Sequence, residues 1–172
     1  MPLDTAAVPD PQAIAADPAL SAFVTANAGS GKTKTLVDRV ARLLLRGAAP
    51  DAILCVTYTK AAAAEMQRRL FGRLGGWAVM GDEALRGELA RLGEPGSQPR
   101  QARTLFARAL ETPGGLKIQT IHAFCEKLLR RFPLEAGVSP NFEVAEDAVQ
   151  AALSADARAV LARLAARPDH PV

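Results

Sequence analysis

The sequence predicts an α/β fold in which parallel strands are covered on both faces by helices. Short apolar runs at 22–25, 53–57 and 116–120 alternate with longer segments in which apolar residues recur at helical spacing. The first run is joined to its helix by a glycine-rich stretch, which is typical of α/β nucleotide-binding proteins. A chain of 172 residues with 49% hydrophobic residues is long enough to bury a sizeable core.

The glycine-rich stretch follows the first predicted strand, Ala22-Phe23-Val24-Thr25, and its residues are Ala26-Asn27-Ala28-Gly29-Ser30-Gly31-Lys32-Thr33. Gly29 and Gly31 lack a Cβ atom, so the backbone can curl tightly and point its N–H groups at an anion. Lys32 would then reach the β- and γ-phosphates of a nucleotide, and the Thr33 hydroxyl would ligate Mg²⁺. The usual phosphate-loop pattern starts with Gly where this chain has Ala26. A glycine turn without a ligand therefore stays open as an alternative.

The next elements follow from caps and breakers. A short helical turn is expected around 12–16, and a longer helix is expected at 33–46, with Gly47 as its left-handed stop. The second strand, 53–57, leads into Thr57-Tyr58-Thr59-Lys60 and an Ala-rich helix at 61–74. Its small side chains would let a backbone phosphate approach the helix start, although a plain strand-to-helix turn has the same pattern.

Residues 75–115 are interpreted as a helical insertion containing two helices, because Gly75-Gly76 breaks the pattern before it. Inside it, Trp77 to Met80 followed by Asp82-Glu83 looks like a strand ending in the acidic pair of an NTPase. Gly81 would displace the carboxylates from the strand end, and the run has only one β-branched residue. We therefore interpret this pair as having no catalytic role.

The third strand, 116–120, runs into Ile121-His122-Ala123-Phe124-Cys125 and a helix that Pro133 ends. His122 alone could equally be a satisfied core histidine. A long Ala-rich amphipathic helix is expected from 145 to 167.

The net charge of +3 leaves both a polyanionic partner and a solvated surface open. Cys55 and Cys125 lie in apolar surroundings and are expected to be buried free thiols. No apolar stretch reaches the roughly 20 residues needed to span a bilayer, and the first residues lack the order of a signal peptide. The expected location is the cytoplasm, without membrane association.

Three stretches in this order resemble motifs I, Ia and Ib of the UvrD-like superfamily 1 DNA helicases: 26–33, 56–66 and 120–125. In that superfamily the first motif position is often Ala, as at Ala26, and a glutamine lies about as far upstream of the loop as Gln12. Within the family, the order looks most like the N-terminal part of the AddA subunits of helicase–nucleases that process double-strand breaks.

The resemblance implies a partial RecA-like P-loop NTPase domain at 1–132 and the start of a helical 1B region at 133–172. It implies that 26–33 bind ATP and Mg²⁺, with Lys32 and Thr33 as the catalytic residues and Thr33 as the metal ligand. The Gln12 amide would both donate to and accept from the adenine edge. Single-stranded DNA would meet Thr57, Tyr58, Thr59, Lys60, Thr120, His122 and Phe124. Many relatives have Asn-Lys after the Thr-aromatic-Thr, whereas this chain has Lys60-Ala61, so its phosphate contact differs.

The implied function is a segment of an ATP-dependent 3′ to 5′ DNA helicase of double-strand-break repair and recombination, with an AddB-like partner subunit. The acidic motif, arginine finger and second RecA-like domain of such helicases have no counterpart in the 172 residues. Because those groups hold Mg²⁺, activate water and close over the γ-phosphate, independent turnover is not expected. A module that binds nucleotide or single strands without turnover, or another P-loop enzyme such as a small kinase, are the alternatives.

Overall fold

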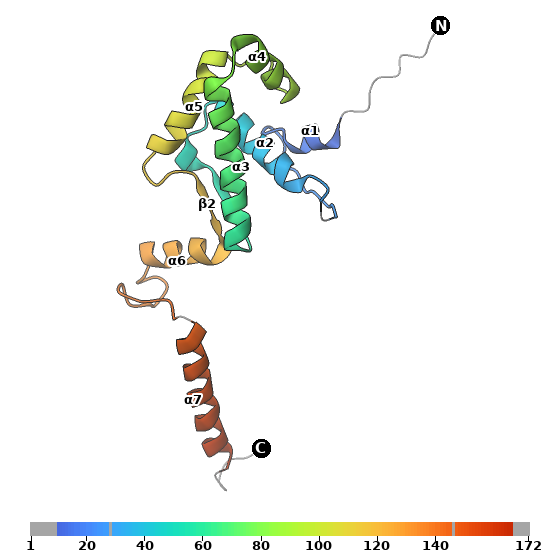
Figure 1. Cartoon of the computed structure of the whole chain (residues 1–172). Coiled ribbons are helices and arrows are strands. Elements are labelled where there is room, and N and C mark those ends of the chain that lie inside the picture. Colours follow the sequence, from blue (N-terminus) through green and yellow to red (C-terminus); the bar gives the residue numbers. More distant parts are fainter. Residues whose placement is uncertain (1–9, 28, 146, 167–172) are drawn as a thin grey trace. The chain divides into compact units, whose positions relative to one another are not determined.

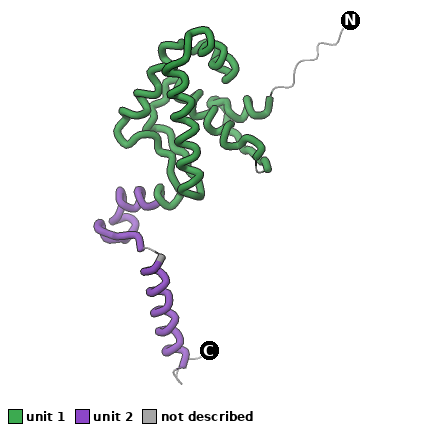
Figure 2. The backbone as a smooth tube through the Cα atoms, in the orientation of Figure 1, with its two compact units in different colours: residues 1–124 green, residues 125–172 purple. Residues whose placement is uncertain are grey.

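The computed structural model describes residues 10–27, 29–145 and 147–166. The chain divides into two compact units, residues 1–124 and 125–172 (Figure 2). The elements in chain order are α1 (Pro11–Ala15), α2 (Lys32–Leu45), the 3₁₀ turn η1 (Pro50–Ala52), β1 (Leu54–Thr57), α3 (Lys60–Val79), α4 (Asp82–Arg91), α5 (Pro99–Glu111), β2 (Lys117–Thr120), α6 (Ile121–Arg131) and α7 (Asp147–Ala165), as Figure 1 shows.

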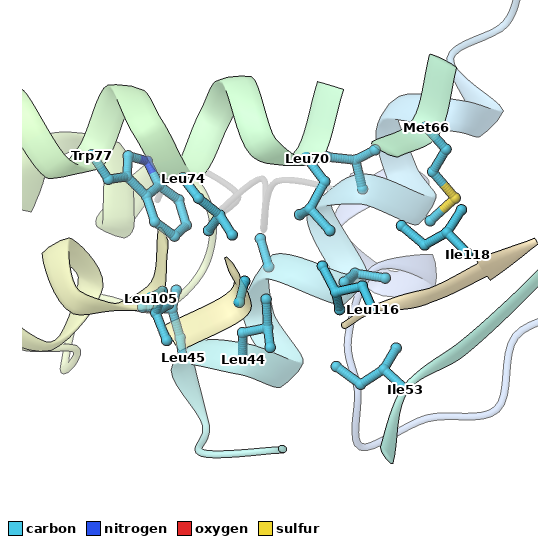
Figure 3. Close-up of a cluster of buried hydrophobic side chains, with 14 of the residues drawn as sticks. Leu44, Leu45, Ile53, Met66, Leu70, Leu74, Trp77, Leu105, Leu116 and Ile118 are labelled. Atoms are coloured by element: carbon cyan, nitrogen blue, oxygen red, sulfur yellow. The ribbon is translucent and has the colours of Figure 1, made fainter. Parts of the chain in front are cut away.

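The core of the first unit forms along α3, which packs against α5, α2 and both strands. Met66, Leu70, Leu74 and Trp77 recur at intervals of three and four residues on the inner face of α3, and each is almost fully buried. Figure 3 shows these side chains pointing toward residues of α2, α5 and the sheet, among them Leu44, Leu105 and Ile118. One long helix therefore organises the unit.

The sheet has two parallel strands in the described part of the chain, as the apolar runs at 53–57 and 116–120 predicted. Cys55 pairs with Ile118 and Thr57 with Thr120, so both strands end at the same level. Cys55 and Ile118 face α3 and are buried, whereas Leu54 and Val56 on the other face are 44% and 42% exposed. The prediction that helices cover both faces of the strands is confirmed for one face only.

The predicted first strand, 22–25, is wrong for this structure. Residues 21–27 have no regular secondary structure, and the Phe23 side chain is 96% exposed. A strand exists only through hydrogen bonds to a neighbour, and β1 pairs with β2 alone among the described residues. An apolar run without such a neighbour remains an extended loop.

The predicted helix end at Gly75-Gly76 is also wrong, because α3 continues to Val79. Each glycine costs about 1 kcal/mol of helix propensity, but burial of Trp77 beyond them outweighs that cost. Gly75 also lies against the Phe106 ring, where a Cβ atom would be 3.6 Å from the nearest ring carbon. The two helices expected in the 75–115 region are present as α4 and α5.

The second unit contains most of α6 and all of α7. In it, the Arg130 guanidinium lies 4.8 Å from the centre of the Phe142 ring, a cation–π contact that fixes the turn after α6. The apolar residues Val149, Leu153 and Leu161 of α7 are exposed within the described structure. Cys125 is exposed as well, so the expectation of a buried thiol holds for Cys55 and fails for Cys125.

Candidate functional site

The glycine-rich stretch forms a left-handed turn that opens directly into α2. Gly29 and Gly31 have φ values of +81° and +88°, a region that other residues rarely adopt. Gly31 is the N-cap of α2, and the first helical residue is Lys32. The unpaired N–H groups and the positive end of the helix dipole therefore lie at this turn, which is the arrangement that binds phosphate.

The loop is held together by its own polar groups. The Ser30 hydroxyl donates to the Asn27 carbonyl at 2.6 Å, and the Lys32 ammonium donates to the carbonyls of Ala26 and Asn27. Lys32 and Thr33 are exposed. The Lys32 ammonium thus bridges the loop, at the position where an incoming phosphate would replace carbonyl oxygens as its partner. Ala28 lies outside the described residues.

Gln12 lies against this turn, although it precedes Ser30 by eighteen positions in the sequence. Its side-chain Nε2 donates to the Ser30 carbonyl at 3.3 Å, and a Cβ atom on Gly31 would come within 3.1 Å of the same nitrogen. Asp10 caps α1 by accepting from the Gln12 N–H at 3.0 Å, and Pro11 supplies the first helical residue. A pocket of about 560 Å³ opens beside Gln12, lined by apolar side chains of α1 and of residues 20–26 and by Lys32.

A second hollow, of about 330 Å³, lies over the loop itself and is lined by residues 29–34 and by Arg69 of α3. Arg69 is held by the Glu65 carboxylate one turn earlier. One turn further along α3, Arg73 pairs with the buried Asp38, which also accepts from Lys34 at 3.0 Å. Reasoning from the sequence did not assign Arg69 or Arg73 to the site. Their i, i+4 spacing after the Ala-rich helix start was the available signal.

The residues after β1 are arranged by a helix cap. The Thr59 hydroxyl accepts from the Ala62 N–H at 3.1 Å and starts α3, while the Thr57 hydroxyl donates to the Thr59 carbonyl at 2.9 Å. Tyr58 is 82% exposed and Lys60 is exposed as well. The cap thus projects an aromatic ring and an ammonium group from the end of the strand.

The end of β2 repeats this device. Thr120 is buried, and its hydroxyl accepts from the Ala123 N–H at 3.2 Å, which caps the start of α6. His122 is exposed, so it is not a core histidine, and Phe124 is half-buried. The Tyr58 and His122 rings meet edge to face, with 6.5 Å between their centres. The structure therefore brings the two strand ends together into one surface.

The acidic pair at 82–83 lies elsewhere, as its interpretation as a chance pattern requires. Trp77 and Val79 are helical, and Asp82 begins α4. The Arg103 guanidinium hydrogen-bonds the Asp82 carboxylate and lowers its pKa, with a further contribution from Arg86. This carboxylate is committed to joining α4 and α5.

Searched across the described residues, no helix is long and apolar enough to cross a membrane. Comparison with known proteins gives a consistent result. An ATP-dependent helicase/nuclease subunit of Lactobacillus acidophilus is 37% identical over 131 residues, covering 76% of this chain and 9% of that protein. The proteins of the same name from Desulforudis audaxviator and Latilactobacillus sakei are 40% and 34% identical over 134 residues, covering 76% and 78% of this chain.

The chain thus spans about a tenth of the length of the curated relatives it matches: 9% of the first two and 13% of the third. The profile of the UvrD/REP helicase N-terminal domain matches residues 8–168, which is nearly the whole sequence. It includes Gln12, the glycine turn and both strand ends. The chain belongs to the UvrD/REP helicase family, as a part of its N-terminal domain.

Proposed function

We propose that this chain binds ATP with Mg²⁺ at the glycine turn and single-stranded DNA at the ends of β1 and β2. In this proposal, residues 1–132 are a partial RecA-like nucleotide-binding domain with a helical insertion at 75–115, and residues 133–172 begin the helical 1B region. Membership of the UvrD/REP family sets the small-kinase alternative aside.

The observation that carries the proposal is the left-handed backbone of Gly29 and Gly31 immediately before Lys32. This geometry directs main-chain N–H groups and a helix N-terminus at one point, where an anion would satisfy their unpaired state. Lys32 adds a positive charge at the same point, and Arg69 adds another across the hollow. A triphosphate matches this concentration of donors.

The roles of the remaining nucleotide residues follow from their positions. Lys32 would exchange its carbonyl partners for β- and γ-phosphate oxygens, and the Thr33 hydroxyl would supply a protein oxygen to Mg²⁺. The ion, when bound, would offset charge on the phosphates. Gln12 would offer its amide to the adenine edge from the rim of the 560 Å³ pocket, whose apolar lining suits a base.

The DNA surface is proposed from the paired strand ends. Tyr58 is exposed and supported by His122, so one face of its ring is available to stack on a base. Lys60 lies at the N-terminus of α3, where its charge and the helix dipole both favour a backbone phosphate. Thr57, Thr59, Thr120 and Phe124 would shape this surface, two of them by capping helices.

The activity of the whole relatives is a further part of the proposal. Their name gives them a helicase and a nuclease role within a larger assembly. For this chain we propose the N-terminal segment of a 3′ to 5′ DNA helicase of double-strand-break repair that acts beside an AddB-like partner. Neither pocket at the loop has an Asp or Glu in its described lining, so we expect these 172 residues to bind ATP without appreciable turnover.

Titration of fluorescent ATP into the chain tests the nucleotide site. Lys32→Ala removes a charge-assisted contact of roughly 1.5 to 3 kcal/mol and should weaken binding about tenfold or more. Lys60→Ala, an exposed lysine at another helix start, is the matched control and should bind ATP as the parent does. Equal affinities for the folded parent and Lys32→Ala would remove the assignment. Phosphate release above background that disappears in Lys32→Ala would show turnover.

A further inference from the structure

Three arginines lie along one face of α2 and contact the segment that carries Gln12. Arg39 donates to the carbonyls of Ala15, Asp17 and Leu20 at 3.1, 2.7 and 2.6 Å. Arg42, one turn later, donates to the Ala13 carbonyl at 3.1 Å. Arg46 donates to the Asp17 carboxylate at 3.2 Å. The segment from α1 to Leu20 is therefore held on α2 through its backbone and one carboxylate.

Arg42 differs from the other two because it is buried. Its side chain is only 7% exposed, and its Nε donates at 2.9 Å to the Glu94 carboxylate, itself 11% exposed. Arg46 donates to the same oxygen of Glu94 at 2.9 Å. This carboxylate comes from the loop between α4 and α5, far from α1 in the sequence.

The backbone places Glu94 through a helix C-cap. Gly93 has a φ of +84°, and the N–H groups of Gly93 and Glu94 donate to the carbonyls of Ala90 and Leu89 at the end of α4. A Cβ atom on Gly93 would be 3.4 Å from the Arg42 guanidinium, so the loop lies directly on that group. The end of α4 thus closes over Arg42 and fixes where its N–H groups point.

These contacts connect two regions that sequence motifs treat separately. A buried guanidinium keeps one orientation only while its charge is paired and its donors are used. The close partner on one side is Glu94, since the Asp17 carboxylate is farther away at 3.7 Å. On the other side the partner is the carbonyl of the residue directly after Gln12. Loss of the Glu94 charge would release Arg42 from that carbonyl and let α1 leave the glycine turn.

We propose that Arg42 and Glu94 are positioning residues that hold Gln12 at the phosphate loop and so determine how strongly the site prefers an adenine nucleotide over a bare triphosphate. The inference rests on the proposed function, and it gives the helical insertion a role at the nucleotide site. Neither residue touches the nucleotide. Both act through the place of α1.

The test compares ATP with inorganic tripolyphosphate as ligands of the full chain. Glu94→Gln keeps the shape of the side chain and removes its charge. We expect roughly three- to tenfold weaker ATP binding and unchanged tripolyphosphate binding, corresponding to the loss of about one hydrogen bond at the base. Glu88→Gln is the matched control, because Glu88 lies on α4 and its carboxylate pairs with the exposed Arg91 at 3.2 Å. It should change neither affinity.

A double-mutant cycle shows whether the effect passes through Gln12. The double variant Glu94→Gln, Gln12→Ala should bind ATP no more weakly than Gln12→Ala alone, because the two changes remove the same contact. If circular dichroism shows that Glu94→Gln is unfolded, Arg42→Lys, which keeps the charge but loses the forked donors, carries the same expectations.

The outcomes separate the two proposals. Equal weakening of ATP and tripolyphosphate, additive losses in the double variant, or no change in any folded variant would each overturn the positioning role while leaving the nucleotide site in place. A parent chain that binds neither ATP nor tripolyphosphate would overturn the proposed function and this inference with it.

Discussion

The two sides of the first unit differ in how their apolar residues are used. On the packed side, α3 presents Leu70, Leu74 and Trp77 to its neighbours, and none of them is more than 1% exposed. On the open side, Phe23 and Tyr58 are 96% and 82% exposed in the described structure. Both sides follow from apolar or aromatic sequence, yet only the packed side has partners for it within the described residues.

The difference separates stability from binding. Burial along α3 supplies the free energy that keeps the unit folded, since each large side chain removed from water contributes about 1.5 to 3 kcal/mol. The glycine turn and the strand ends contribute little burial, and their polar groups are available to ligands. Substitutions on the two sides should therefore change different measured quantities.

The largest effect is expected in the packed side. Trp77→Ala should lower the free energy of unfolding by about 3 to 5 kcal/mol, because the indole fills the space between α3 and its neighbours. Urea denaturation followed by circular dichroism measures this. Val79→Ala is the control on the same helix, where the side chain is 88% exposed and the change should be near zero. Equal losses at the two positions would remove the distinction between the two sides.

On the open side, Tyr58→Ala should leave stability unchanged and weaken single-stranded DNA binding by on the order of 1 to 3 kcal/mol, with little dependence on the base. Fluorescence anisotropy with labelled oligo-dT and oligo-dA measures the affinity. Tyr58→Phe keeps the ring and the edge contact with His122, so it should retain most of the binding. If the Ala variant binds both oligonucleotides as tightly as the parent, the strand ends are not a stacking surface.

A smaller and different effect is expected at Lys60. Lys60→Gln should reduce the dependence of DNA affinity on salt by about one ion, since it removes one phosphate contact and its released counterion. The same anisotropy assay, repeated across a potassium chloride series, gives the slope. Lys117→Gln, an exposed lysine on β2, offers the comparison and should leave the slope unaltered. A slope identical in all three proteins would exclude a phosphate contact at this helix start.

Local patterns predicted the parts of the fold whose causes are local. The helix start at Lys32, its stop at Gly47 and the parallel pair of strands follow from glycine geometry and short apolar runs. The failures arise where tertiary context decides. Gly75 and Gly76 do not end α3, because burial of Trp77 exceeds their propensity cost.

The candidate site shows the same division. The glycine turn was predictable because its chemistry lies in consecutive residues. The contact between Tyr58 and His122 required the register of β1 and β2, and the pairing of Arg42 with Glu94 joins positions 52 residues apart. No periodicity in one segment encodes such a pair. Buried charge becomes visible only after the fold brings its partner to it.

The smallest effect on stability is expected at Phe23, where sequence and structure disagree. As part of a strand between covering helices, this ring would be buried, and Phe23→Ser would cost several kcal/mol. In the structure the ring is 96% exposed, so the free energy of unfolding should change by no more than about 0.5 kcal/mol. Phe106→Ser is the matched comparison, because Phe106 meets Phe71 edge to face at 6.2 Å and lies on Gly75. Losing that pair should cost clearly more than about 1 kcal/mol. A loss at Phe23 as large as at Phe106 would mean that residues 22–25 are buried in solution, which would restore the strand that the apolar run predicted.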